Sequence, residues 1–375
     1  MENMVTMNKD FWLNKKVLIT GHTGFKGSWL LVWLNMLGAD VYGLSLSTLP
    51  GKSLFTEITK KKTLSKDFFI DIRNIEKLKI SINEINPDIV FHLAAQPLVR
   101  DSYKNPLETW STNLMGSLNV LESLSVINNH CAVIMVTTDK VYKNMEWEYG
   151  YRENDQLGGY DHYSARKAAT EIDLSSWRDS FCGFDKKASN LLIASARSGN
   201  VIGGGDWAKD RIFPDVIRSL ENDKKIIIRN PNSTRPWQHV LDPLSGYIVL
   251  AEKLYQSKNQ ACKDSNKPLT SAFNFGPNIT SNKSVEFLVK EIMKYWPGII
   301  EKNNHDFNQF HEAEKLHLQV DKAFNLLNWE PIWNLEFSVK KTVEWYKKFK
   351  EHSYSSLDLC TSDIKCYEKK NFIYR

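Results

Sequence analysis

The sequence has few cysteines and no long hydrophobic segment. Five cysteines occur among 375 residues, and none has CxxC spacing, so we expect neither a disulfide framework nor a cysteine-rich metal site. The nine histidines are dispersed, and no metal cluster is expected from them. No apolar run approaches the roughly 20 residues that cross a bilayer, and the first residues lack a signal peptide's apolar core. We therefore expect a cytoplasmic protein without a membrane partner.

The charge is close to balanced. A formal net charge of +5 arises from 49 basic and 44 acidic residues spread along the chain. Nucleic-acid binding requires a basic arm or stripe, which this pattern lacks, so no nucleic-acid partner is expected. The length exceeds that of one comfortable core and favours a large α/β unit with an appended lobe.

Short apolar runs alternate with helix-like segments in the first half of the chain. Continuous apolar strands separated by helices are typical of a parallel sheet covered on both faces. We therefore predict an α/β fold, a Rossmann-type doubly wound sheet over residues 1–198. The expected strands are 15–20, 40–46, 88–95, 132–138 and 190–197, and the helices include 28–39 and 109–127.

The composition changes after residue 198. Loops rich in Gly, Pro, Asn and aromatic residues are followed by two amphipathic helices, at 282–296 and 335–350. We predict a smaller mixed α/β substrate-binding lobe, mainly over 199–350, with the chain returning to the first domain around 225–260. The polar, Lys-rich segment 351–375 is expected to be a peripheral tail.

A glycine loop, TGHTGFKG, follows the first predicted strand and begins a helix. Gly21, Gly24 and Gly27 let the backbone approach a pyrophosphate at the positive end of that helix. Three ordinary turn glycines are the alternative. The second strand is followed by neither an acidic residue nor an arginine, and we expect NAD rather than NADP. Asp71, after the next strand, is a candidate for the adenine amino group.

Tyr163 and Lys167 are four residues apart in YSARK, so on a helix they face the same side. A lysine ammonium there lowers the free-energy cost of a tyrosinate, which could then act as a base. An isolated YxxxK usually marks an exposed helix face. Here it follows both a glycine loop and a strand that ends in Thr137 and Thr138, which favours the functional interpretation.

Together, GxxGxxG, HLAAQPLV, VTTDKVY and YSARK resemble the extended short-chain dehydrogenase/reductase family. The strings TGHTGFKGSWL, GNVIGGGDWAKDRIFPD and RPWQHVLDPLSGY resemble its CDP-glucose 4,6-dehydratase branch over residues 14–346. The resemblance implies an NAD-dependent lyase and a homodimer that assembles through a four-helix bundle. The implied cofactor site comprises Gly21, Thr23, Gly24, Phe25, Lys26, Gly27, Asp71, Ile72, Leu93, Ala94, Ala95, Thr112, Tyr163 and Lys167.

The resemblance also implies roles at the end of the fifth predicted strand. Tyr163 would take the sugar's C4 hydroxyl proton, Asp139 would protonate the departing C6 hydroxyl, and Thr138 would polarise the C4 ketone. Lys140 would remove the C5 proton if its pKa falls, or stabilise the enolate if it stays charged. A solvated Asp139–Lys140 pair in a surface turn is the alternative.

Planar arginine side chains suit the diphosphate of a nucleotide sugar. Candidate substrate residues are Gln96, Asn200, Arg211, Arg235 and His239, although His239 could equally be structural. The segment 310–318 also resembles a substrate loop of the family. Two other functions stay open: an epimerase or a dehydratase for another nucleotide sugar, and an inactive nucleotide-binding relative.

Overall fold

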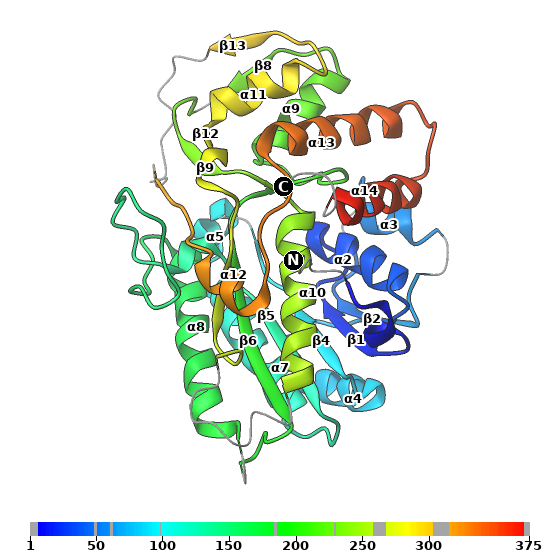
Figure 1. The fold of residues 1–375 in the computed structure, drawn as a ribbon, viewed down its shortest axis with the longest axis vertical. Coiled ribbons are helices and arrows are strands. Elements are labelled where there is room, and N and C mark those ends of the chain that lie inside the picture. The colour runs from blue at the N-terminus through cyan, green and yellow to red at the C-terminus, as the bar shows by residue number, and fades with distance from the viewer. Residues whose placement is uncertain are drawn as a thin grey trace.

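A seven-stranded parallel sheet forms the centre of the molecule (Figure 1). The computed structural model describes residues 7–48, 51–60, 63–97, 99–183, 186–228, 230–257, 268–302 and 315–370. The strand order β11-β6-β5-β4-β1-β2-β3 reverses direction between β1 and β4, as in a doubly wound sheet, which confirms the predicted fold class. The strands are β1 Lys16–Thr20, β2 Asp40–Ser45, β3 Lys66–Phe69, β4 Ile89–His92, β5 Cys131–Val136, β6 Leu191–Ser198 and β11 Ala272–Phe275.

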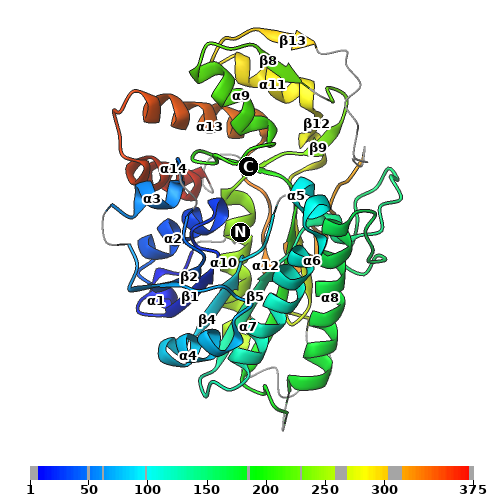
Figure 2. The same cartoon turned by 180° about the vertical axis from the view of Figure 1, so that it is seen from behind.

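Helices cover both faces of this sheet (Figures 1 and 2). On one face, α4 (Ile75–Ile85), α7 (Gly116–Leu124) and α8 (His162–Phe181) share a hydrophobic cluster with Leu18 of β1. On the other, α2 (Phe25–Met36) and α10 (Leu241–Gln256) pack with Val17. Neighbouring residues of one strand thus enter opposite layers, which is why these strands are apolar throughout.

The segment 109–127, expected as one helix, is helical without a break through residue 124 but includes a π-helical turn. It contains α6 (Pro106–Trp110), the π-helical turn η1 (Ser111–Met115) and α7; α5 (Val99–Lys104) precedes them. A π-helical turn inside a helix often marks a functional site. This one places Asn113 where its side chain binds the Gln96 backbone, accepting from N at 2.7 Å and donating to O at 3.1 Å.

A smaller lobe lies beyond the carboxyl edge of the sheet (Figure 1). It contains the short sheets β8/β13 and β9/β12 and the helices α9, α11 and α13. The chain returns to the main sheet with α10 (Leu241–Gln256), inside the expected range 225–260, and β11 then adds the edge strand. Bounds in this part are β7 Val201–Ile202, α9 Ile212–Glu221, β8 Ile226–Ile228, β9 Thr234–Pro236, β10 Gln238–His239, η4 Ile279–Ser281, β12 Asn282–Ser284, α11 Val285–Met293, β13 Ile300–Lys302, α12 Asp321–Leu327 and α13 Leu335–Lys350.

The C-terminal segment forms a helix instead of the expected peripheral tail. Helix α14 (Ser356–Lys370) packs against α2 and buries Leu359, Cys360, Ile364 and Tyr367. The Tyr367 hydroxyl donates to Asp242 Oδ1 at 2.8 Å. Frequent lysines concealed this apolar stripe in the sequence. Residues 371–375 lie outside the described part of the chain.

The remaining short helices are α1 (Lys9–Trp12), α3 (Leu54–Ile58) and the 3₁₀ turn η2 (Asp139–Val141). The described cysteines, Cys131, Cys182, Cys360 and Cys366, are free thiols, and Cys262 lies outside the described residues. Over those residues, no helix is both long and apolar enough to span a membrane.

Candidate active site

The glycine loop lies between β1 and α2, at the point where the strand order reverses. Gly21 has a φ of +76°, and a Cβ there would approach Ala94 N to 2.6 Å. A Cβ on Gly27 would come within 2.3 Å of Gly21 O, so side chains cannot be accommodated at either position. Gly24 caps the start of α2 without a side chain. The positive end of α2 is therefore open to an anion.

Hydroxyl groups take the place of the missing acidic residue after β2. Thr23 Oγ1 lies 2.6 Å from Ser45 Oγ and donates to Leu46 O at 3.2 Å.

The Asp71 carboxylate accepts two hydrogen bonds from the Arg73 side chain, at 3.0 and 2.6 Å. This pairing lowers the pKa of Asp71.

Asp139 and Lys140 follow β5 directly, in the turn η2. Asp139 is 3% exposed, so the alternative of a solvated surface pair is wrong for this carboxyl group. Its Oδ1 accepts from Thr138 Oγ1 at 2.9 Å, and a Cβ on Gly199 would lie 2.8 Å from its Oδ2. Burial raises the pKa of Asp139, against the opposing effects of Lys140, the Thr138 hydrogen bond and other cations. Burial therefore makes this carboxyl group a weaker acid than an ordinary aspartate.

Tyr163 and Lys167 lie in the first two turns of α8. Asp161 caps this helix by accepting from the N–H groups of Tyr163 and Ser164 at 2.8 and 2.9 Å. Lys167 is buried, and its Nζ donates to Val136 O of β5 at 3.5 Å. Burial, aided by Arg166, lowers the pKa of Lys167 to about 8. Burial raises the pKa of Tyr163, and its side chain also hydrogen-bonds Thr138.

Lys26, predicted to contact the cofactor, extends from the glycine loop across the edge of the sheet. Its Nζ donates to Ser198 Oγ at 2.7 Å, and Ser198 Oγ lies 2.6 Å from the Tyr247 hydroxyl. Burial lowers the pKa of Lys26 to about 7; Arg211 acts in the same direction and Asp139 opposes it. Lys26 is thus electrostatically coupled to the residues predicted to perform the chemistry.

Two of the predicted substrate residues extend toward the same edge from the small lobe. Arg211 donates to Asp206 Oδ2 at 2.9 Å and interacts electrostatically with Tyr163. Arg235, on β9, donates to Thr234 O at 2.7 Å and opposes the pKa rise of Asp139. Asn200 is half-buried, directly after β6.

His239 has the surroundings of a structural residue. Its ring is fully buried, with centroids 4.6 Å from Trp333 and 5.9 Å from Trp29. Burial lowers the pKa of His239 to about 3, so it stays neutral. The structural alternative that the sequence left open fits this position better than substrate binding. The first part of the 310–318 segment, through 314, lies outside the described residues.

A buried network that sequence reasoning missed joins α8 to the strands beside it. Glu171, one turn beyond Lys167, accepts from Thr137 Oγ1 at 2.5 Å, Ser195 Oγ at 2.7 Å and Arg197 Nη2 at 2.8 Å. Arg197 also donates to the Tyr142 hydroxyl at 2.8 Å. The i, i+4, i+8 spacing of Tyr163, Lys167 and Glu171 was the available signal, because it puts all three on one helix face.

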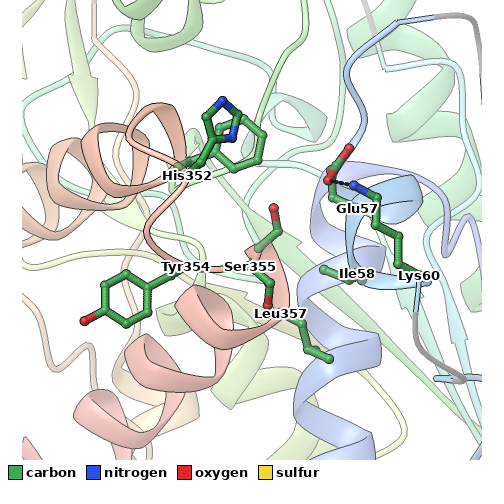
Figure 3. A pocket seen from close by; sticks show the side chains of 9 residues that line it. Glu57, Ile58, Lys60, His352, Tyr354, Ser355 and Leu357 are labelled. Carbon is green, nitrogen blue, oxygen red and sulfur yellow. Dashed lines mark hydrogen bonds and ion pairs between the residues drawn. The ribbon is translucent and has the colours of Figure 1, made fainter.

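A separate pocket of about 360 Å³ lies between α3 and the turn that joins α13 to α14 (Figure 3). Ile58, Leu357 and Tyr354 contribute to its lining, and Lys60 pairs with Glu57 at 2.5 Å beside it. None of the predicted site residues lines this pocket. Among the residues that the structure describes, no group of three or more His, Cys, Asp or Glu side chains could hold a metal ion.

The doubly wound sheet, the glycine loop and the Tyr163–Lys167 pair define an extended short-chain dehydrogenase/reductase. The chain belongs to the GDP-mannose 4,6-dehydratase family, whose model matches residues 18–342. It is 47% identical to a CDP-glucose 4,6-dehydratase from Salmonella typhimurium over 91% of this chain and 93% of the relative. The resemblance inferred from the motifs is thereby confirmed.

Solved structures share the fold. An epimerase from Methanothermobacter thermautotrophicus matches with a TM-score of 0.75 and 22% identity, over 92% of this chain and 96% of its own. A dTDP-glucose 4,6-dehydratase from Bacillus anthracis, solved in complex with NAD, matches with a TM-score of 0.72 and 21% identity, over 90% and 98%.

Proposed function

We propose that the protein is an NAD-dependent hydro-lyase that converts CDP-glucose to CDP-4-keto-6-deoxyglucose and water. The observation that carries this proposal is the buried Asp139 carboxyl group, with Lys140 beside it, at the strand end that faces Tyr163. A C4-epimerase also needs the tyrosine and lysine, but it has no use for an acid and a second amine. The 47% identical CDP-glucose 4,6-dehydratase supports cytosine as the base.

The glycine loop fits a dinucleotide. The close contacts at Gly21 and Gly27 leave backbone N–H groups and the start of α2 to receive a pyrophosphate. Thr23 and Ser45 offer hydroxyl groups where an acidic residue commonly binds the ribose. Bound NAD supplies an acceptor for a hydride from C4 that is later returned to C6, so the overall reaction is redox-neutral.

In the first half of the reaction, Tyr163 takes the proton of the C4 hydroxyl. The adjacent Lys167 ammonium stabilises the tyrosinate, and its pKa of about 8 keeps it mostly charged at neutral pH. Thr138 then hydrogen-bonds the C4 oxygen and helps to polarise the ketone. This ketone makes the C5 proton acidic enough to be removed.

In the second half, Asp139 gives its proton to the C6 oxygen while the C5 proton is removed. The C6–O bond breaks, water leaves, and a C5–C6 double bond forms next to the ketone. A carboxyl group whose pKa is raised by burial is suited to this task because it holds its proton until the leaving group needs it. Lys140 either accepts the C5 proton or stabilises the enolate by its charge.

Arg211, Arg235 and Asn200 are proposed to hold the nucleotide sugar. Both arginines lie close enough to influence Tyr163 or Asp139 electrostatically. A guanidinium can bond two phosphate oxygens at once. The CDP diphosphate would thereby be held beside the reacting sugar.

We also propose a cytoplasmic homodimer that supplies a deoxysugar for lipopolysaccharide O-antigen synthesis. The exposed apolar side chains Leu107, Met115 and Ile172, on α6, η1 and α8, support an interface on this face of the sheet. A four-helix bundle formed by α7 and α8 of two subunits would cover them. Analytical ultracentrifugation of wild type and Ile172→Glu tests this assembly: the variant should be monomeric, and an unchanged dimer would contradict it.

The test of the activity uses CDP-glucose deuterated at C4, with NAD, and mass spectrometry or NMR of the product. Deuterium at C6 with loss of water supports the proposal. Retention of all oxygens with inversion at C4 would show an epimerase instead. The same assay with UDP-glucose and dTDP-glucose reports on the choice of base.

A further inference from the structure

Arg166 is a fully buried arginine on α8. Its relative exposure is 0%, and its Nε, Nη1 and Nη2 atoms have no hydrogen-bond partner among the residues that the structure describes. A buried guanidinium is normally paired, because removal of its hydration is expensive. An unpaired one therefore requires a physical explanation.

The guanidinium of Arg166 lies against the proposed catalytic base. Its Cζ is 5.2 Å from the centroid of the Tyr163 ring, within the range of a cation–π contact. Arg166 precedes Lys167 directly, so Tyr163 has a cation at both i+3 and i+4 on the same helix. Burial lowers the pKa of Arg166 to about 10, which leaves the group charged at neutral pH.

We propose that Arg166 is a positioning residue that acts through Tyr163: its unpaired charge stabilises the phenolate and fixes the ring over the sugar's C4 hydroxyl. This inference rests on the proposed role of Tyr163 as the base. A cation that is already desolvated and has no carboxylate bonded to it interacts strongly with a charge that develops beside it. A paired arginine at this position would be partly neutralised.

Several other charged groups around Tyr163 also influence its pKa. Burial and Asp139, from η2, raise the pKa of Tyr163; Arg211, Arg166 and the hydrogen bond with Thr138 lower it. Lys167 lies one turn further along α8, Lys26 and Lys140 interact with Asp139, and the helix cap Asp161 acts on Arg166 from a distance. The Arg166 guanidinium is the cation that lies over the Tyr163 ring. Removal of the Arg166 guanidinium should therefore raise the pKa of Tyr163, because less positive charge then opposes the effects of burial and Asp139.

The proposal makes opposite predictions for stability and activity. Arg166→Met keeps the aliphatic stem and removes an unsatisfied buried charge, so the urea midpoint should stay the same or rise. The same substitution should raise the pKa of Tyr163 by about 1 unit or more, within the range that a neighbouring charge produces. A residue needed only for packing would lower stability and leave this pKa in place.

The direct test is a spectrophotometric titration of tyrosinate in the free protein, without substrate. The Tyr163 signal is isolated from the 14 tyrosines by subtracting the curve of Tyr163→Phe. Arg166→Met and Arg166→Gln should both shift it upward, because both remove the guanidinium charge. Arg178→Met, on the same helix about four turns from Tyr163, is the matched control and should leave it unchanged.

The pH dependence of C4 oxidation supplies the second readout. The acidic limb of the kcat/KM profile should move upward with the titration, and turnover at neutral pH should fall about tenfold for a shift of one unit. Coincident curves for wild type and Arg166→Met would overturn the proposal. If the Met variant does not fold, the Gln variant decides it, and a wild-type Tyr163 titration in that variant would refute the role of charge. Because the titration needs no substrate, a wrong sugar assignment would show only as absent wild-type turnover.

Discussion

The buried Glu171–Arg197 pair offers a sharp test of how the active site is held together. Glu171 is bonded to Thr137, Ser195 and Arg197 at 2.5 to 2.8 Å, and the two ionic side chains are 1% and 4% exposed. The pair joins α8, which carries Tyr163 and Lys167, to β5 and β6. The Glu171→Gln substitution tests this network because it preserves the size of the side chain and removes its charge.

The expected loss of stability arises because the Glu171→Gln substitution leaves the buried Arg197 charge without its partner. Breaking a buried ion pair from one side costs about 3 to 5 kcal/mol. The glutamine side chain of the Glu171→Gln variant can still accept one hydrogen bond, and hydroxyl groups can rotate to accept from its amide, so we expect a loss of about 3 kcal/mol. Arg197→Met should cost a similar amount. The double variant should lose less than the two singles together, with a coupling energy of about 2 kcal/mol.

Urea unfolding measures these values as shifts of the midpoint at constant slope. The neighbouring control is Glu122→Gln, which breaks a partly exposed pair with Lys187 and should cost less than about 1 kcal/mol. Since Arg197 and the hydroxyl donors lower the pKa of Glu171 in spite of burial, its stabilisation is present above the unfolded-state pKa. It is lost as the pH falls through the lower folded-state value.

Activity should fall together with stability. A small displacement of α8 against β5 separates Tyr163 from Thr138, and misplacement of about 1 Å can reduce turnover about 100-fold. We expect kcat to fall more than KM changes, because the residues proposed to hold the sugar nucleotide, Arg211, Arg235 and Asn200, are not part of this network. A Glu171→Gln enzyme with wild-type stability and kcat would refute the view that this network sets the geometry.

Three further predictions concern single groups. Asp139→Asn and Lys140→Met should still permit C4 oxidation, seen as transient NADH absorbance, but stop water loss. Lys140→Arg should restore turnover only if the charge of Lys140 suffices. Full dehydration by both the Asp139→Asn and the Lys140→Met enzymes would contradict the assigned roles. Burial lowers the pKa of His92 to about 3, below the unfolded value of about 6.5, so neutral His92 contributes its full stabilisation above about pH 6.5. As the pH falls below that value, the free energy of unfolding of wild type should decrease by up to about 1.4 kcal/mol per pH unit relative to His92→Gln. Parallel stability curves for the two proteins would exclude this. Tyr367→Phe removes a donor to buried Asp242 and should lower the urea-derived stability by about 1 to 2 kcal/mol, whereas no change would mean that α14 is held by apolar contacts alone.

The sequence was sufficient for the elements with a clear period. Continuous apolar strands predicted the central sheet, and the glycine loop predicted the turn at Gly21, because both are local signals. The position of Asp139 at the carboxyl end of a buried strand was also visible in the sequence. The burial of α14 was not, since its apolar contacts are separated by lysines and acidic residues.

Long-range pairs were beyond reach for a different reason. Glu171 and Arg197 are 26 residues apart, and nothing in either local pattern shows that α8 crosses β6 at that point. The orientation of the Lys26 side chain is likewise set by a distant partner, because its Nζ donates to Ser198 Oγ. Nothing in the YSARK string shows whether the charge of Arg166 is buried, and only the packing of α8 shows that it is.

The distribution of cations around the site bears on how ligand binding and protons are coupled. Burial lowers the pKa of Lys26 to about 7 and that of Lys167 to about 8, and in both cases a neighbouring arginine adds to the effect. A diphosphate held by Arg211 would offset part of this repulsion and raise the pKa of Lys26. Because that pKa lies near neutrality, nucleotide-sugar binding should take up a fraction of a proton at about pH 7 to 8. Calorimetry in buffers of different ionisation enthalpy measures this uptake directly, and it should disappear in Lys26→Met. Equal uptake in that variant would place the titrating group elsewhere.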